Sequence, residues 1–181
     1  MNQIQEILSF WFDENGYDEW FGRDEAFDAK INARFSACHQ AVQSGRCRHW
    51  CETADGRLAS ILVLDQFSRN LFRGQAAAFQ NDAQARAIAR TAIAHGDDQN
   101  ALSPDRQMFY YVPFEHSEQL EDQERSLIWL SEMGDDRLRD AAQIHYDIIA
   151  RFGRFPHRNA ALGRETTAEE AAFLENKLPF Y

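Results

Sequence analysis

Polar side chains interrupt the apolar faces of three predicted helices. Asp65 shares a helix face with Leu58 and Leu62, and Gln123 and His145 occupy the same kind of position in two later helices. Buried polar groups need hydrogen-bond partners, and they usually find them in one another. The three residues therefore predict an internal network, which is either a device that fixes the packing or the floor of a pocket.

Asp65 is expected to be paired or to change its protonation state, because an isolated carboxylate in that position would cost on the order of several kcal/mol. Arg69 lies one helical turn later on the same face, and Arg73 one turn further. Two interpretations stay open. Asp65 and Arg69 form a buried ion pair that only fixes the packing, or Asp65 belongs to a site that performs acid–base chemistry.

Two later segments carry opposite charge. Residues 151–164 contain four arginines and no carboxylate, whereas residues 113–125 contain five carboxylates and one arginine. Gly153 and Pro156 predict a loop in the basic segment, where aromatic, Arg, His and Asn side chains are mixed. The segments either neutralise each other, or the arginines clamp a phosphate or carboxylate group.

The leading hypothesis is a pocket for a small anionic ligand, bearing phosphate or carboxylate, with hydrolase or transferase chemistry as its extension. The candidate acid–base residues are Asp65, His145, Glu115 and His116. The candidate ligand-binding residues are Arg69, Arg73, Gln123, Arg151, Arg154, His157, Arg158 and Asn159. Whether the chain is an enzyme is left open.

Helical periodicity dominates the elements that would position these residues. The sequence predicts about eight helices with short loops, and no alternating strand pattern. The segment 58–67 is apolar nearly all round, which places it at the centre of the fold. A helix opened by Ser103 and Pro104 is expected to end at Pro113, another helix to end at Gly153, and Thr167 to begin the last one.

The expected architecture is a single all-α domain over residues 1–181. Nothing in the composition marks a second domain, and 181 residues are enough to bury a core. Short connections between helices predict antiparallel pairs, which could stack as a short superhelix.

Composition excludes several function classes. The net charge of −10 disfavours nucleic acids and anionic membranes as partners, because an acidic surface repels phosphate. No apolar run is long enough for a membrane-spanning helix, and residues 1–12 do not resemble a secretory signal. We therefore expect a cytoplasmic protein.

Neither a metal nor a cofactor is expected. Cys38, Cys47 and Cys51 lie near His39 and His49, but they lack the paired spacing of a structural zinc site. Reduced thiols are the simpler interpretation of an odd number of cysteines. The chain contains no glycine-rich phosphate loop and no nucleophile elbow.

Several of these segments together resemble the bacterial domain-of-unknown-function family 924. They are the opening Ile7-Leu8-Ser9-Phe10-Trp11-Phe12, then Trp20-Phe21, the segments beginning at Asp65, Pro113 and Arg151, and the closing Gly163-Arg164-Glu165. The resemblance implies a tetratricopeptide-like all-α fold in a bacterial cytosolic protein, and no activity. Ser68 departs from the proline that is usual in the family pattern.

Two further hypotheses compete with the ligand pocket. A tetratricopeptide-like superhelix could bind a peptide or a partner helix on its concave face, without catalysis. The arginines would then brace the helix layers. Alternatively, an aromatic surface around Trp11, Trp20 and Phe21 could form a homodimer.

Overall fold

The computed structural model describes residues 2–175, and every regular element within that range is helical. The predicted all-α class is confirmed. The chain forms two compact units. The N-terminal unit comprises the residues up to Arg73 together with Ala77–Pro113, and the C-terminal unit comprises Gly74–Ala76 and the residues from Phe114 onward. The single domain expected from the sequence stays a prediction, since two compact units can belong to one domain.

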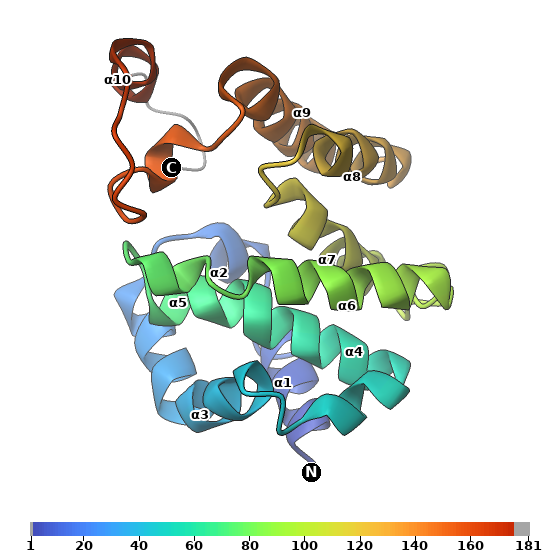
Figure 1. Cartoon of the computed structure of the whole chain (residues 1–181). Helices are drawn as coiled ribbons and strands as arrows, with labels where there is room; N and C mark the ends of the chain where they lie inside the picture. Colours follow the sequence, from blue (N-terminus) through green and yellow to red (C-terminus); the bar gives the residue numbers. More distant parts are fainter. Residues whose placement is uncertain (1, 176–181) are drawn as a thin grey trace. The chain divides into compact units, whose positions relative to one another are not determined.

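The N-terminal unit is built around one buried helical segment (Figure 1). This segment runs through α4 (Ala54–Ile61), the π-helix η2 (Leu62–Phe67) and α5 (Ser68–Leu71). Helices of the same unit that contact it are α1, α3 and α6. The bounds in this unit are α1 Gln3–Phe12, α2 Tyr17–Phe21, α3 Glu25–Gln43, α6 Asp82–Ala94 and most of α7 Pro104–Glu115.

All residues from Gly56 to Ser68 are buried, as the apolar pattern predicts. The sequence did not predict the π-helix, in which the backbone hydrogen bonds are spaced one residue wider than in an α-helix. Gly56 allows the close approach at the start of the segment, because a Cβ there would lie 2.0 Å from the carbonyl oxygen of Trp50.

Aromatic rings fill the core of this unit. Trp11 and Trp20 stack with ring centroids 6.1 Å apart, and the indole N–H of Trp20 donates to the Trp11 carbonyl. Trp11 is fully buried and Trp20 nearly so. Trp11 and Trp20 therefore do not form the predicted aromatic surface, because their rings pack inward and remove apolar area from water, whereas Phe21 is 39% exposed. The homodimer itself stays a prediction.

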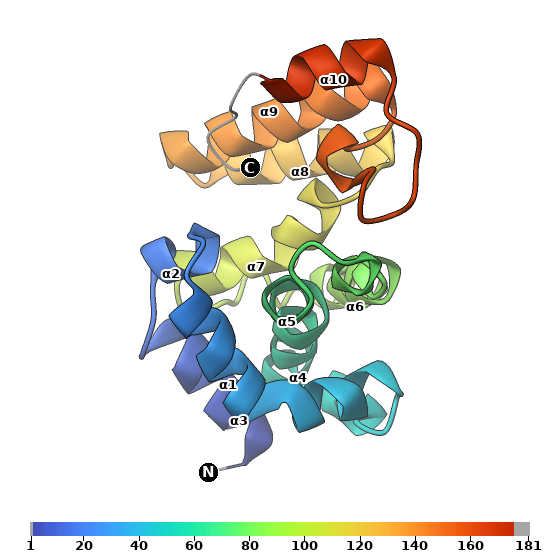
Figure 2. The same ribbon diagram turned by 90° about the vertical axis from the view of Figure 1, so that its left-hand side faces the viewer.

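The C-terminal unit contains α8 (Leu120–Glu132), α9 (Asp136–Phe152) and α10 (Ala168–Glu175). Figure 2 shows α8 and α9 side by side, the antiparallel pair that their short connection predicts. Ile148, Ile149 and Phe155 form a small apolar core, against which Phe152 and Phe173 pack. Gly153 ends α9 in a left-handed conformation, as predicted.

Pro113 does not end α7, contrary to the expectation. It lies inside a helix that continues to Glu115. A proline inside a helix removes one backbone hydrogen bond and crowds the preceding turn, but it does not forbid two further helical residues. Glu115 is thereby positioned by the last turn of a helix instead of by a loop. Within residues 2–175, no helix is both long and apolar enough to span a membrane.

Candidate functional site

Asp65 lies in η2 with an exposed fraction of 1%. One of its carboxylate oxygens is 3.1 Å from Nη1 of Arg69, and the other accepts a hydrogen bond from the Gln66 side chain. Arg69 also donates to both carboxylate oxygens of Asp82. The predicted buried Asp65–Arg69 contact is confirmed, and the charge of Arg69 is shared between two carboxylates.

Arg73 points to a different partner. It donates two hydrogen bonds, both of 2.7 Å, to the carboxylate of Asp28 in α3. Burial raises the pKa of Asp28, but the hydrogen bonds from Arg73 and Asn70 outweigh that effect and hold the pKa below its ordinary value. Arg69 and Arg73 thus both make ion pairs in the N-terminal unit.

A further buried polar network in the same unit was missed by sequence reasoning. Ser68 Oγ donates to the Leu64 carbonyl, lies 2.8 Å from His39 Nε2, and accepts a hydrogen bond from Asn81. Burial lowers the pKa of His39, so its ring is neutral. Because the Ser68 proton is donated to the Leu64 carbonyl, Nε2 of His39 is the donor to Ser68 Oγ. The departure from proline at position 68 was the available signal, because proline has no side-chain group that can make these bonds.

The C-terminal unit contains a buried carboxylate–histidine pair. Nδ1 of His145 lies 3.1 Å from Oε1 of Glu115 and 2.8 Å from the carbonyl oxygen of Ala141. Both neighbours are acceptors when Glu115 is ionised, so Nδ1 carries the proton. In the neutral ring the lone pair is then on Nε2. A carboxylate that fixes the tautomer of a histidine in this way is the arrangement of a general base.

The Gln123 side chain is hydrogen-bonded to the backbone of the segment that contains Glu115. Its Nε2 donates to the carbonyl oxygens of Glu115 and Ser117, each at 2.6 Å. The exposed fraction of Gln123 is 1%. Of the three residues predicted to form one network, Gln123 and His145 are connected within this unit through Glu115.

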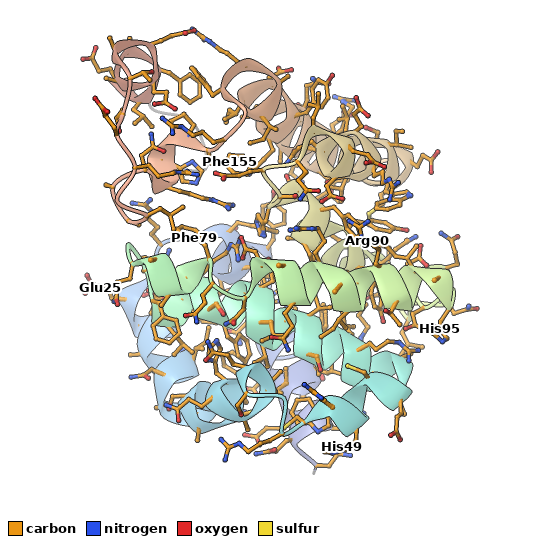
Figure 3. All side chains as sticks on the ribbon, in the orientation of Figure 1. Glu25, His49, Phe79, Arg90, His95 and Phe155 are labelled. Carbon is orange, nitrogen blue, oxygen red and sulfur yellow. The ribbon has the colours of Figure 1, made fainter. Side chains whose placement is uncertain are left out.

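Three groups that can carry positive charge surround the ring of Phe155, which is labelled in Figure 3. His145 and His157 lie 5.6 and 5.4 Å from it, between ring centroids, and the Arg158 guanidinium is 4.4 Å from its centroid. His116 lies 6.4 Å from His145, and its carbonyl oxygen accepts a hydrogen bond from Arg158. We call His116, His145, Phe155, His157 and Arg158 the Phe155 cluster.

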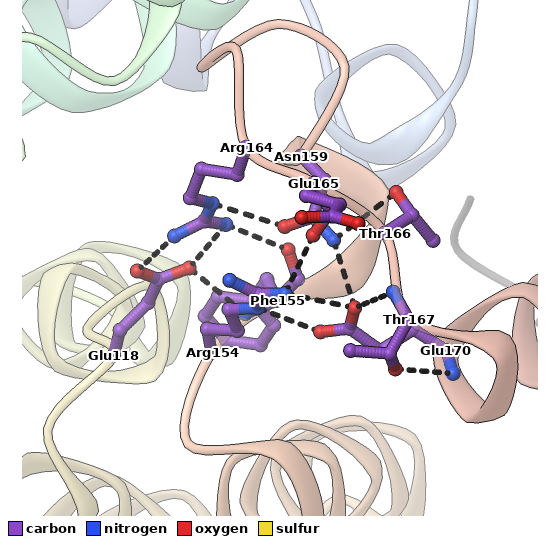
Figure 4. Close-up of polar contacts among 9 residues, drawn as sticks. All are labelled: Glu118, Arg154, Phe155, Asn159, Arg164, Glu165, Thr166, Thr167 and Glu170. Carbon is purple, nitrogen blue, oxygen red and sulfur yellow. Dashed lines mark hydrogen bonds and ion pairs between the residues drawn. The ribbon is translucent and has the colours of Figure 1, made fainter.

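Figure 4 shows two arginines of the basic segment, Arg154 and Arg164, bound to carboxylates. Arg154 makes a bidentate pair with Glu170, and Arg164 makes one with Glu118. Arg151 pairs with Glu169. The Arg164–Glu118 pair is the neutralisation between the two segments that the sequence left open as an alternative to an anion clamp, whereas Glu169 and Glu170 lie outside residues 113–125.

Asn159 is also engaged within the network of Figure 4. Its Nδ2 donates to Glu170 and Thr166, and its Oδ1 accepts from Arg164. The hydrogen bond from Arg154 is the largest cause that lowers the pKa of Glu170, to about 2. For Glu118, burial raises the pKa, but hydrogen bonds from Arg164 and the Phe155 amide bring it below its ordinary value.

The candidate residues are thus divided between the two units. Asp65, Arg69 and Arg73 belong to the N-terminal unit, and the remaining candidates belong to the C-terminal unit. The Phe155 cluster, with Glu115 and Gln123, gathers six of the predicted residues. The expectation that Asp65 shares one cavity with them stays a prediction.

In the part of the chain that the structure describes, no group of three or more His, Cys, Asp or Glu residues could hold a metal ion. The three cysteines form no disulfide. Burial raises the pKa of the Cys38 thiol to about 11, which keeps it protonated.

The protein is all-α within residues 2–175, and its C-terminal unit contains a buried carboxylate–histidine pair. The family described as "Bacterial protein of unknown function (DUF924)" matches residues 7–177. The chain belongs to this family, so the resemblance drawn from its motifs is confirmed. A solved structure of a protein of unknown function from Agrobacterium tumefaciens is 42% identical. Its TM-score to this chain is 0.90, with 96% of this chain and 97% of the other covered. None of the curated proteins compared with the chain matches it.

Proposed function

We propose that the C-terminal unit binds a small ligand with a phosphate or carboxylate group at the Phe155 cluster. The single observation that supports this most is the gathering of His145, His157 and Arg158 around one buried ring. Arg158 provides a permanent positive charge, and each histidine gains one when it is protonated. Because the net charge of the chain is −10, an anion is attracted only where positive groups are concentrated. Three groups that can be positive are concentrated around the Phe155 ring.

We further propose that His145 acts as a general acid–base catalyst on the bound ligand, in a hydrolase or transferase reaction. Nε2 would accept the proton of an attacking water or hydroxyl group and return it to the leaving group. Glu115 would stabilise the imidazolium that forms between these two steps. Asp65 takes no part in this proposal, because its carboxylate is occupied by Arg69 and Gln66.

The binding proposal is tested by thermal unfolding in the presence of inorganic phosphate, ethyl phosphate or acetate. We expect at least one of these anions to raise the Tm of the native protein. His157→Gln removes one cationic group from the cluster and should reduce that rise by half or more. His95→Gln is the matched control, because His95 is exposed and belongs to the N-terminal unit. Equal shifts in native protein and His157→Gln, or no shift with any anion, would contradict the proposal.

The catalytic extension is tested with p-nitrophenyl phosphate and p-nitrophenyl acetate as probes. We expect native protein to hydrolyse one of them, and His145→Gln to lower kcat about 100-fold or more. The control His95→Gln should retain the native rate. Failure of native protein to turn over either probe would count against the extension while leaving the binding result to be judged by itself.

A second candidate function is supported by a specific observation. Arg151, Arg154 and Arg164 are bound to carboxylates, as expected if they brace the layers of a tetratricopeptide-like peptide-binding module. That function predicts saturable binding of a defined peptide from a synthetic array. It also predicts no thermal shift with any of the three anions.

A further inference from the structure

Two buried polar atoms on α8 have no hydrogen-bond partner among residues 2–175. They are Oε1 of Gln123 and Oγ of Ser126, and the exposed fractions of these residues are 1% and 0%. Buried polar groups are satisfied in the great majority of cases, so two such atoms three residues apart on one helix indicate a group that residues 2–175 do not supply.

The orientation of the Gln123 amide is fixed by its surroundings. Its nitrogen lies 2.6 Å from two carbonyl oxygens, those of Glu115 and Ser117. Only the NH2 group can donate to them, so exchanging the oxygen and nitrogen positions would place three acceptors together. Oε1 is therefore an acceptor directed away from these carbonyls.

Ser126 lies three residues after Gln123, on the same face of α8. Side chains at this spacing have Cβ atoms about 5–6 Å apart, a distance that one small polar group can bridge. A hydroxyl group is the match, because it can donate to Gln123 Oε1 and accept from the hydroxyl of Ser126. An ammonium group could donate to both oxygens but would leave the Ser126 proton without an acceptor, and a methyl group could do neither.

Gln123 connects this pair of atoms to the carboxylate–histidine pair. Gln123 binds the backbone of Glu115, and the Glu115 carboxylate contacts His145. We infer that Gln123 and Ser126 form a subsite for a hydroxyl group of the ligand, so that the site selects anions that also carry a hydroxyl. The inference rests on the proposed anion binding at the Phe155 cluster.

The experiment compares two probes of similar size by calorimetry, 2-hydroxyethyl phosphate and ethyl phosphate. Native protein should bind the hydroxyl-bearing probe about 10-fold more tightly, which is the scale of one buried hydrogen bond. Ser126→Ala should reduce that preference to about two-fold or less. Ser131→Ala is the matched control, because Ser131 lies on the same helix but is exposed, and it should keep the preference.

Equal affinities of the two probes for native protein would overturn the inference, and would mean that a fixed water serves both atoms. A preference that survives Ser126→Ala would overturn it as well. If neither probe binds, and neither inorganic phosphate nor acetate raises the Tm, the proposed function itself fails, and that outcome is distinct from equal binding. The Tm of each variant without a probe verifies that it is folded.

Discussion

The hydroxyl of Ser68 makes the most contacts of any single polar atom in the buried network of the N-terminal unit. It donates to Leu64, and it accepts from the neutral ring of His39 and from Asn81. None of these groups is exposed enough to exchange this partner for water. One small side chain therefore satisfies groups in η2, in α3 and at the N-terminal cap of α6.

Ser68→Ala should accordingly cost about 1–3 kcal/mol of unfolding free energy, because it leaves two buried donors unsatisfied. The measurement is urea denaturation at neutral pH, followed by circular dichroism. Ser131→Ala, at an exposed position, should change stability by less than about 0.5 kcal/mol. A Ser68→Ala protein as stable as the native one would show that His39 and Asn81 find other partners.

Glu170 provides a prediction on pH. Its folded pKa is about 2, below the ordinary value of 4.5, chiefly through the hydrogen bond from Arg154. A lowered folded pKa means that the stabilisation is complete above pH 4.5 and is lost as the pH falls toward 2. The native protein should therefore exceed Glu170→Gln in urea midpoint at pH 7, and the difference should shrink between pH 5 and pH 2.

Glu169→Gln is the control for this series, because Glu169 is largely exposed in its pair with Arg151. Its difference from native protein should be small at every pH, as is usual for exposed pairs. A gap for Glu170→Gln that stays constant down to pH 2 would show that the pair with Arg154 does not lower the pKa of Glu170 on folding.

At the scale of elements, helix ends marked by local chemistry were predictable from the sequence. Thr167 and Glu170 form the predicted capping box at the start of α10, and Gly153 ends α9. The continuation of α7 past Pro113 and the π-helix were not predictable, because tertiary packing decides them. Periodicity also identified Asp65, Gln123 and His145 as buried, since a polar residue on an apolar stripe is visible in the sequence alone.

The start of α4 provides a prediction at this scale. Gly56→Ala would place a methyl group 2.0 Å from the Trp50 carbonyl, so the short helix Arg48–Glu52 or α4 must move. We expect a loss of about 1–3 kcal/mol in unfolding free energy, measured by urea denaturation. Gly16→Ala should cost less, because the nearest atom to its new methyl group would be 3.9 Å away. Equal losses would mean that close packing at Gly56 is not the cause.

For the molecule as a whole, net charge makes a prediction about partners. At −10 and a pI near 5.0, the protein should not bind a fluorescein-labelled DNA duplex. Fluorescence anisotropy should stay unchanged up to about 10 µM protein at physiological salt. A rise in anisotropy that disappears with added salt would contradict the expectation and indicate a local basic surface.

The candidate site was predictable only in part, because residue types are visible in the sequence but contacts between distant residues are not. His145, Glu115, His116, His157 and Arg158 were named from their types and neighbours, and they gather within one unit. The pairing of Arg154 with Glu170, and of Arg73 with Asp28, depends on three-dimensional contacts between distant residues. Charge counts along a sequence cannot distinguish an arginine bound to a carboxylate from one that awaits a ligand.

The burial of the segment from α4 to α5 has a kinetic consequence. A helix with water on one face can form early and dock later, whereas residues 56–68 are buried on every side. Their stabilisation arises only when α1, α3 and α6 are in contact with them. We therefore expect the centre of the N-terminal unit to form late and together with its neighbours, so that this unit folds in one cooperative step.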